Sequence, residues 1–131
     1  VVVGVARLPP GADALVPAVH LRLVPPSIPQ DERWAAERAD DIMDRYVSLS
    51  ASGADGMKGV THLIWPESAF PFLLTENPVA LAAIADLLPP GTTLITGAAR
   101  GDRSTGALRV FNSIYVLHRD HLGAQYSAKY R

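Results

Sequence analysis

One carboxylate is the residue best placed to do chemistry. Glu67 lies in the segment Trp65-Pro66-Glu67-Ser68-Ala69, directly after an apolar run typical of a buried strand. Ligands of α/β proteins bind at the carboxyl ends of strands, so this position suits a functional site. Between the aromatic rings of Trp65, Phe70 and Phe72 the carboxylate would lose hydration, which suits a general base working near neutral pH. The residues leave a second interpretation open, in which Glu67 caps a loop or pairs with an arginine.

Other side chains are candidates for a functional role only if they lie close to Glu67. Lys129 falls near the end of a possible strand, where a lone lysine commonly guards a sheet edge. Trp34 stands at the start of a predicted helix and fits either the core or the wall of a pocket. Ser68 lacks the flanking glycines of a hydrolase serine. The segment Gly97–Gly101 lacks the spacing of a phosphate-binding loop, so we interpret it as a turn.

Cysteine and histidine usage limits the metal and redox chemistry of the chain. None of the 131 residues is Cys, which excludes disulfides, Cys-ligated zinc and a thiol nucleophile within them. His118 and His121 form an HxxH pair, but a metal site needs a third ligand and no HExxH motif is present. We therefore expect no metal and no other cofactor.

Composition predicts one globular domain or a piece of a larger one. A formal net charge of −1 with 48% hydrophobic residues favours a folded chain and gives no global attraction to nucleic acid. No signal peptide is visible, and no apolar stretch reaches the roughly 18–20 uninterrupted residues of a membrane span. We expect a soluble segment with a proline-rich linker at residues 1–17 and a domain at residues 18–131.

The spacing of apolar residues predicts an alternation of strands and helices. Strands are expected at Val19–Val24, Val60–Trp65, Thr92–Gly97 and Leu108–Leu117, with a fifth within Gly123–Tyr130. Helices are expected at Asp31–Ser50 and from Asn77-Pro78 to Leu88, and a turn at Ala98–Gly106. This order predicts an α/β fold with a mixed sheet covered by helices on one face.

Five segments carry a resemblance to a known family. They are Leu21–Gln30 (LRLVPPSIPQ), Trp34, Thr61–Ala69 (THLIWPESA), Leu94–Ala98 (LITGA) and Phe111–Ile114 (FNSI). In this order, from about residue 19 to the C-terminus, the chain resembles the nitrilase-type domain of bacterial apolipoprotein N-acyltransferases.

The resemblance implies a fold and a set of site residues. The fold would be a nitrilase-like αββα sandwich, of which this chain is the first half. The catalytic residues would be a Glu-Lys-Cys triad, with Glu67 as the general base and Lys129 stabilising the tetrahedral intermediate. Trp34 matches an aromatic residue near the family's active site. Since this chain has no Cys, the nucleophile would lie beyond it, and the 131 residues alone would be inactive.

The resemblance also implies a reaction and a location. An acyl chain would pass from a phospholipid to the Cys as a thioester, and then to the α-amino group of the diacylglyceryl-cysteine that begins a lipoprotein. Membrane helices outside this chain would hold the domain on the periplasmic side of the inner membrane. Two alternatives stay open: a soluble amidase or carbamoylase of the nitrilase superfamily, and a catalytically inactive domain that binds lipids or proteins.

Overall fold

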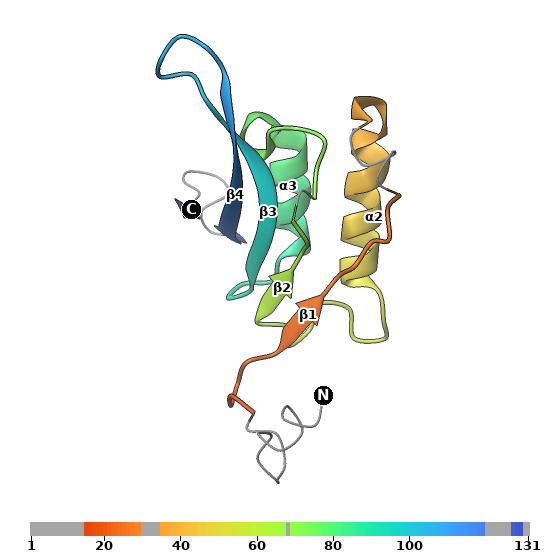
Figure 1. The fold of residues 1–131 in the computed structure, drawn as a ribbon. Coiled ribbons are helices and arrows are strands. Elements are labelled where there is room, and N and C mark those ends of the chain that lie inside the picture. Colours follow the sequence, from red (N-terminus) through yellow and green to blue (C-terminus); the bar gives the residue numbers. More distant parts are fainter. Residues whose placement is uncertain (1–14, 30–34, 68, 120–126, 130–131) are drawn as a thin grey trace, which may run out of the picture.

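The computed structural model describes residues 15–29, 35–67, 69–119 and 127–129. Its regular elements are β1 (Leu21–Leu23), η1 (Ala36–Arg38), α2 (Ala39–Ala51), β2 (His62–Ile64), η2 (Leu74–Glu76), α3 (Pro78–Leu87), β3 (Thr93–Asp102), β4 (Arg109–His118) and β5 (Ser127–Lys129). The strands form one sheet in the order β1-β2-β3-β4-β5. Strand β2 pairs parallel with both β1 and β3. Strand β4 pairs antiparallel with both β3 and β5. Both α2 and α3 lie on the same side of this sheet (Figure 1), which confirms the prediction of a mixed sheet with helices on one face.

The two helices differ in how well the sequence predicts their beginnings. Helix α3 begins as expected, because the side chain of Asn77 accepts a hydrogen bond from the backbone N–H of Ala80 at 3.0 Å and Pro78 fills the first turn. Helix α2 begins only at Ala39 and follows a short 3-10 turn, so the predicted start at Asp31 is wrong over the described residues 35–38. Neither helix, within the described ranges, is long and apolar enough to cross a membrane.

Strand β3 continues well beyond its predicted end at Gly97. It runs to Asp102, so the expected turns at Gly97–Gly101 and at the start of Ala98–Gly106 are wrong. Small residues suggested a turn, but each is paired with β4, and Arg100 lies opposite Phe111. The guanidinium of Arg100 lies 4.6 Å from the Phe111 ring centroid, and that of Arg109 lies 5.1 Å away. These cation–π contacts favour the extended ladder.

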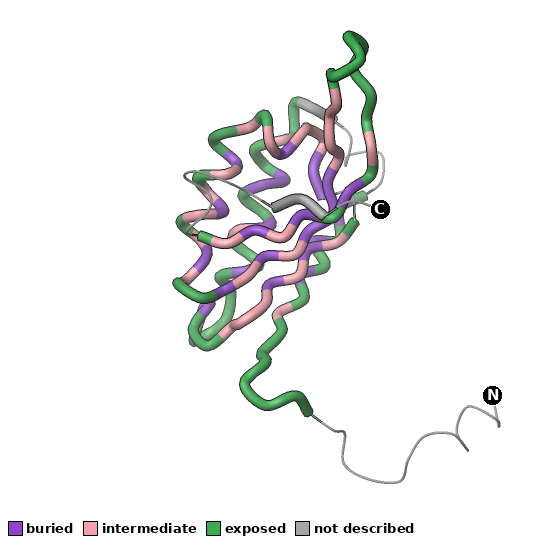
Figure 2. The backbone as a smooth tube through the Cα atoms, turned by 90° about the vertical axis from the view of Figure 1, so that its left-hand side faces the viewer, coloured by how far each residue is buried: buried purple, intermediate pink, exposed green. Residues whose placement is uncertain are grey.

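The core lies between the sheet and the two helices. Alternate residues of the central strands are buried against α2 and α3, as expected from the two-residue period of a strand; they are Leu63, Leu94, Thr96, Ala98, Ser113, Tyr115 and Leu117. The fully buried side chains from the helices are Tyr46 and Ser50 of α2 and Ile84 of α3. Burial is concentrated in the middle of the strands, and the tip of the β3–β4 hairpin is exposed (Figure 2).

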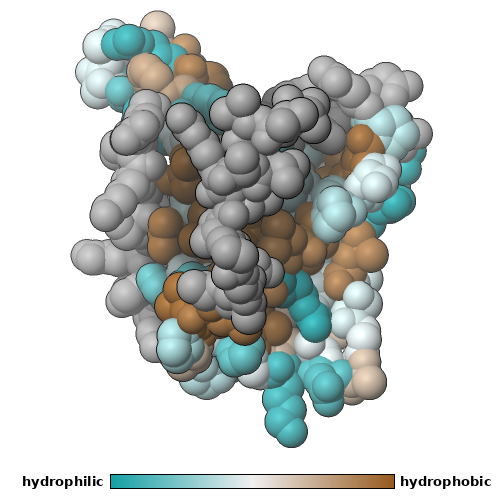
Figure 3. Space-filling model, turned by 60° about the horizontal axis from the view of Figure 1, so that its bottom comes forward, coloured by the Kyte–Doolittle hydropathy of each residue, from teal (hydrophilic) through white to brown (hydrophobic). Residues whose placement is uncertain are grey.

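The opposite face of the sheet carries an apolar row that the helices do not cover. The row crosses four strands in register, through Leu23, Ile64, Ile95 and Val116. Leu23 is 69% exposed, and the neighbouring Ile114 is 55% exposed. Apolar surface is also visible beside polar residues when the molecule is seen from below (Figure 3). This side of the sheet is therefore the open face of the described fold.

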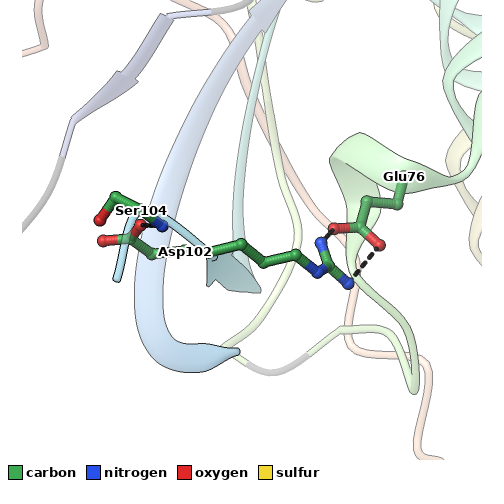
Figure 4. Close-up of polar contacts among 4 residues, drawn as sticks. Glu76, Asp102 and Ser104 are labelled. Carbon is green, nitrogen blue, oxygen red and sulfur yellow. Dashed lines mark hydrogen bonds and ion pairs between the residues drawn. The ribbon is translucent and has the colours of Figure 1, made fainter. Parts of the chain in front are cut away.

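An ion pair joins the loop between β3 and β4 to the segment before α3. Two guanidinium nitrogens of Arg103 donate to the two carboxylate oxygens of Glu76, one of them at 3.3 Å (Figure 4). This hydrogen bonding lowers the pKa of Glu76 from its ordinary value of 4.5. Gly101 allows β3 to lie close to the Leu73 side chain, because a Cβ at position 101 would be 2.8 Å from Leu73 Cδ1.

Candidate active site

The segment that carries Glu67 is held against strand β3 by backbone hydrogen bonds on both sides. The N–H of Trp65 donates to the carbonyl of Ile95 at 2.9 Å, and the N–H of Gly97 donates to the carbonyl of Pro66 at 3.2 Å. Beyond Glu67, the N–H of Ala69 donates to the carbonyl of Gly97 at 3.1 Å. Glu67 therefore lies just past the carboxyl end of β2, level with Gly97, as the sequence predicts.

Trp65 anchors this segment to helix α2. Its indole Nε1 donates to Oγ of Ser50 at 2.9 Å, and Oγ of Ser50 in turn donates to the carbonyl of Tyr46 at 2.7 Å. The rings of Trp65 and Tyr46 are 4.8 Å apart between centroids. Since both aromatic residues are almost fully buried, the backbone two residues before Glu67 is fixed by the core.

The expected dry surroundings of Glu67 are not found. Its side chain is exposed. Phe70 and Phe72, which were expected to enclose it, stack on one another with centroids 5.2 Å apart, and Phe70 also packs against Tyr46. The prediction was wrong because the aromatic rings after Pro66 pack into the core and leave the carboxylate on the surface.

Glu67 is bound instead by a side chain from strand β4. The amide Nδ2 of Asn112 donates a hydrogen bond to its Oε1. Both residues line a cavity of about 410 Å³ that opens on the sheet, together with Trp65, Ile95, Thr96, Gly97, Ser113 and Ile114. The cavity thus combines one carboxylate and one amide with mainly apolar walls, as ligand sites commonly do.

The register of the sheet places the backbone of Lys129 beside Ile114, one of the residues that line the cavity. Lys129 is the partner of Ile114 on β4, and Ile114 is the partner of Gly97 on β3. Gly97 is bonded to Pro66, the residue before Glu67. These positions form one row across the sheet, so the backbones next to Glu67 and at Lys129 are separated by three strand spacings, or about 14 Å. Lys129 therefore lies in the same row of the sheet as the segment that carries Glu67.

Other predicted residues lie elsewhere or outside the described ranges. Trp34 and His121 lie outside them, and so does Ser68. His118 Nδ1 lies 3.1 Å from Oγ1 of Thr93. No cluster of three His, Asp or Glu side chains suited to a metal ion occurs among residues that the structure describes.

Asn112 is the site residue that the sequence analysis did not select. Its segment entered only as part of a resemblance. The available signal was an Asn inside a predicted strand otherwise rich in apolar residues, since Asn is depleted in strands. Its contact with Glu67 spans 45 residues of sequence, and such a contact follows only from the sheet order.

Comparison with known proteins identifies the relatives of this chain. It is 44% identical over 124 residues to an apolipoprotein N-acyltransferase of Bradyrhizobium diazoefficiens, covering 89% of the chain. It is 44% identical over 129 residues to the enzyme of that name from Rhodopseudomonas palustris, covering 91% of the chain. The chain is homologous to part of the apolipoprotein N-acyltransferases. The Rhizobium meliloti N-acyltransferase matches at 39% identity over 111 residues.

The match extends over most of the chain but a small part of each N-acyltransferase. The chain spans 23% of the Bradyrhizobium protein, 24% of the Rhodopseudomonas protein and 21% of the Rhizobium protein. No protein-family profile matches the chain. The resemblance seen in the sequence motifs is confirmed at the level of homology to this family.

Proposed function

We propose that this chain is the first half of the nitrilase-type domain of an apolipoprotein N-acyltransferase. The observation that supports the proposal is the row in the sheet from Pro66 through Gly97 and Ile114 to Lys129, in which Gly97 and Ile114 line the same cavity as Glu67. The names of the relatives favour acyl transfer over the hydrolysis of small amides.

In the proposed reaction Glu67 takes the proton from a cysteine thiol supplied outside these residues. The thiolate attacks the ester carbonyl of a phospholipid, and Lys129 stabilises the oxyanion that develops there. The C–O bond of the ester then breaks, and the departing alcohol oxygen receives the proton. The α-amino group of the lipoprotein cysteine next attacks the thioester and gives its N–H proton to Glu67. The C–S bond breaks, which leaves an N-acylated product, and the released thiolate takes the proton back from Glu67.

The open face of the sheet supports the proposed αββα arrangement. Burial of the apolar row at Leu23, Ile64, Ile95 and Val116 would be favourable, at about 25 cal/mol for each Å² of apolar surface removed from water. A covering layer there would also exclude water from the cavity and from Glu67. Trp34 is proposed to lie near the same pocket, and membrane helices outside this chain would keep the domain at the periplasmic side of the inner membrane.

Product analysis tests this function against its two alternatives. The full-length protein that carries this chain is incubated with a phospholipid and a peptide that begins with diacylglyceryl-cysteine. Mass spectrometry should detect a peptide heavier by one acyl chain and an equal amount of lysophospholipid. Release of free fatty acid or cleavage of small amides without peptide acylation would support the amidase alternative. Lipid or peptide binding without any product would support the inactive binding domain.

A further inference from the structure

Asn112 contacts the proposed general base directly from the neighbouring part of the sheet. A carboxylate only accepts hydrogen bonds, so the amide nitrogen of Asn112 is the atom that faces Oε1 of Glu67. Among the described residues no group hydrogen-bonds the second oxygen, Oε2. The contact therefore fixes one carboxylate oxygen and leaves the other available for a proton.

The position of Asn112 in β4 directs Glu67 across the sheet. Asn112 pairs with Ala99 of β3 and lies two residues before Ile114, so both side chains are on the same open face. Glu67 follows β2, and its hydrogen bond to Asn112 thus passes over β3 to reach β4. Ile114 is in turn the register partner of Lys129. Asn112 draws the carboxylate toward the strand that neighbours Lys129.

We propose that Asn112 is a positioning residue, which holds Glu67 over the cavity with Oε2 directed at the group that loses its proton. The inference rests on the proposed function, since it assigns Asn112 a role in the proton transfer carried out by Glu67. An exposed glutamate side chain samples several rotamers unless a partner fixes it. A displacement of about 1 Å in a reacting group can reduce a rate about 100-fold, so one hydrogen bond at this point has a large effect on the chemical step.

Two substitutions separate positioning from simple packing. In the full-length protein, Asn112→Ala removes the donor, and Asn112→Asp keeps almost the same volume but places a negative charge beside Glu67. Asn112→Ala should lower the rate constant of thioester formation about 10- to 100-fold with little change in KM for the phospholipid. Asn112→Asp should lower it further, because two carboxylates repel and neither donates. Val110→Ala, at an exposed position on the same face of β4, is the matched control and should leave the rate unchanged.

The relative rates of thioester formation in Asn112→Ala and Asn112→Asp distinguish positioning from packing. A role in packing alone predicts that Asn112→Asp stays near the wild-type rate and that Asn112→Ala loses more, and this result would overturn the proposal. Wild-type rates in Asn112→Ala would overturn it too. Glu67→Gln, measured in parallel, separates a failure of the proposed function from a failure of the role of Asn112. Thioester formation at the wild-type rate in Glu67→Gln would contradict the proposed function itself. Loss in Glu67→Gln with no loss in Asn112→Ala would contradict only the role of Asn112.

Discussion

The indole Nε1 of Trp65 donates a hydrogen bond to Oγ of Ser50, and this contact joins the end of β2 to the last turn of helix α2. Both side chains are almost completely buried. Trp65 lies two residues before Glu67, so the contact fixes the point at which the loop that carries Glu67 leaves the sheet. The site is thus supported from the core side by a polar contact inside an aromatic cluster.

Loss of the Ser50 hydroxyl should destabilise the protein. Ser50→Ala leaves the buried N–H of Trp65 without its acceptor, which should cost about 1–3 kcal/mol in the free energy of unfolding. Ser52→Ala removes a hydroxyl that also donates to a backbone carbonyl, but at an exposed position, and should change stability by less than about 0.5 kcal/mol. Urea denaturation of the two variants measures the difference. Equal stabilities would show that the Trp65 contact contributes little.

The sequence predicts most of the sheet because its signals are local. Alternating apolar residues identify the strands, and Asn77 with Pro78 identifies the start of α3. The extension of β3 to Asp102 was missed because it depends on pairing with β4, where Phe111 and its two arginine neighbours stabilise residues that alone favour a turn. Local propensity is overridden there by tertiary contact.

The pair between Arg103 and Glu76 should respond to pH. The hydrogen bond from Arg103 lowers the pKa of Glu76, so its stabilising contribution is complete above the ordinary value of 4.5 and is lost as the pH falls through the lowered value. In Arg103→Gln the pKa of Glu76 should rise toward 4.5, as measured by NMR titration of its carboxyl carbon. Arg38→Gln, which affects a separate pair with Asp41, should leave that titration unchanged. The contribution to stability is small because both partners are exposed.

Replacement of Lys129 tests the register of the last strand. In the full-length protein Lys129→Ala should lower turnover about 100-fold, the typical effect of removing a single donor to a developing oxyanion. Lys58→Ala removes the same charge from an exposed loop position and should not change turnover. Initial rates of peptide acylation provide the measurement. Full activity in Lys129→Ala would mean that another cation fills this role.

The candidate site is only partly predictable from sequence. Glu67 was found because its place after a strand is a local property. Its exposure and its hydrogen bond to Asn112 depend on which way the rings of Trp65 and Phe70 turn and on which strand follows β3. These are properties of packing and sheet order, and no motif of a few residues contains them.

The most direct test of the whole account is acyl-enzyme trapping in the full-length protein with Glu67→Gln, followed by mass spectrometry of the intact protein. The glutamine amide cannot accept the thiol proton, so the acyl adduct should be absent from this variant. Glu37→Gln, the same exchange at an exposed position in η1, should form the adduct normally. An acyl adduct of normal abundance in Glu67→Gln would contradict the assignment of Glu67 as the base.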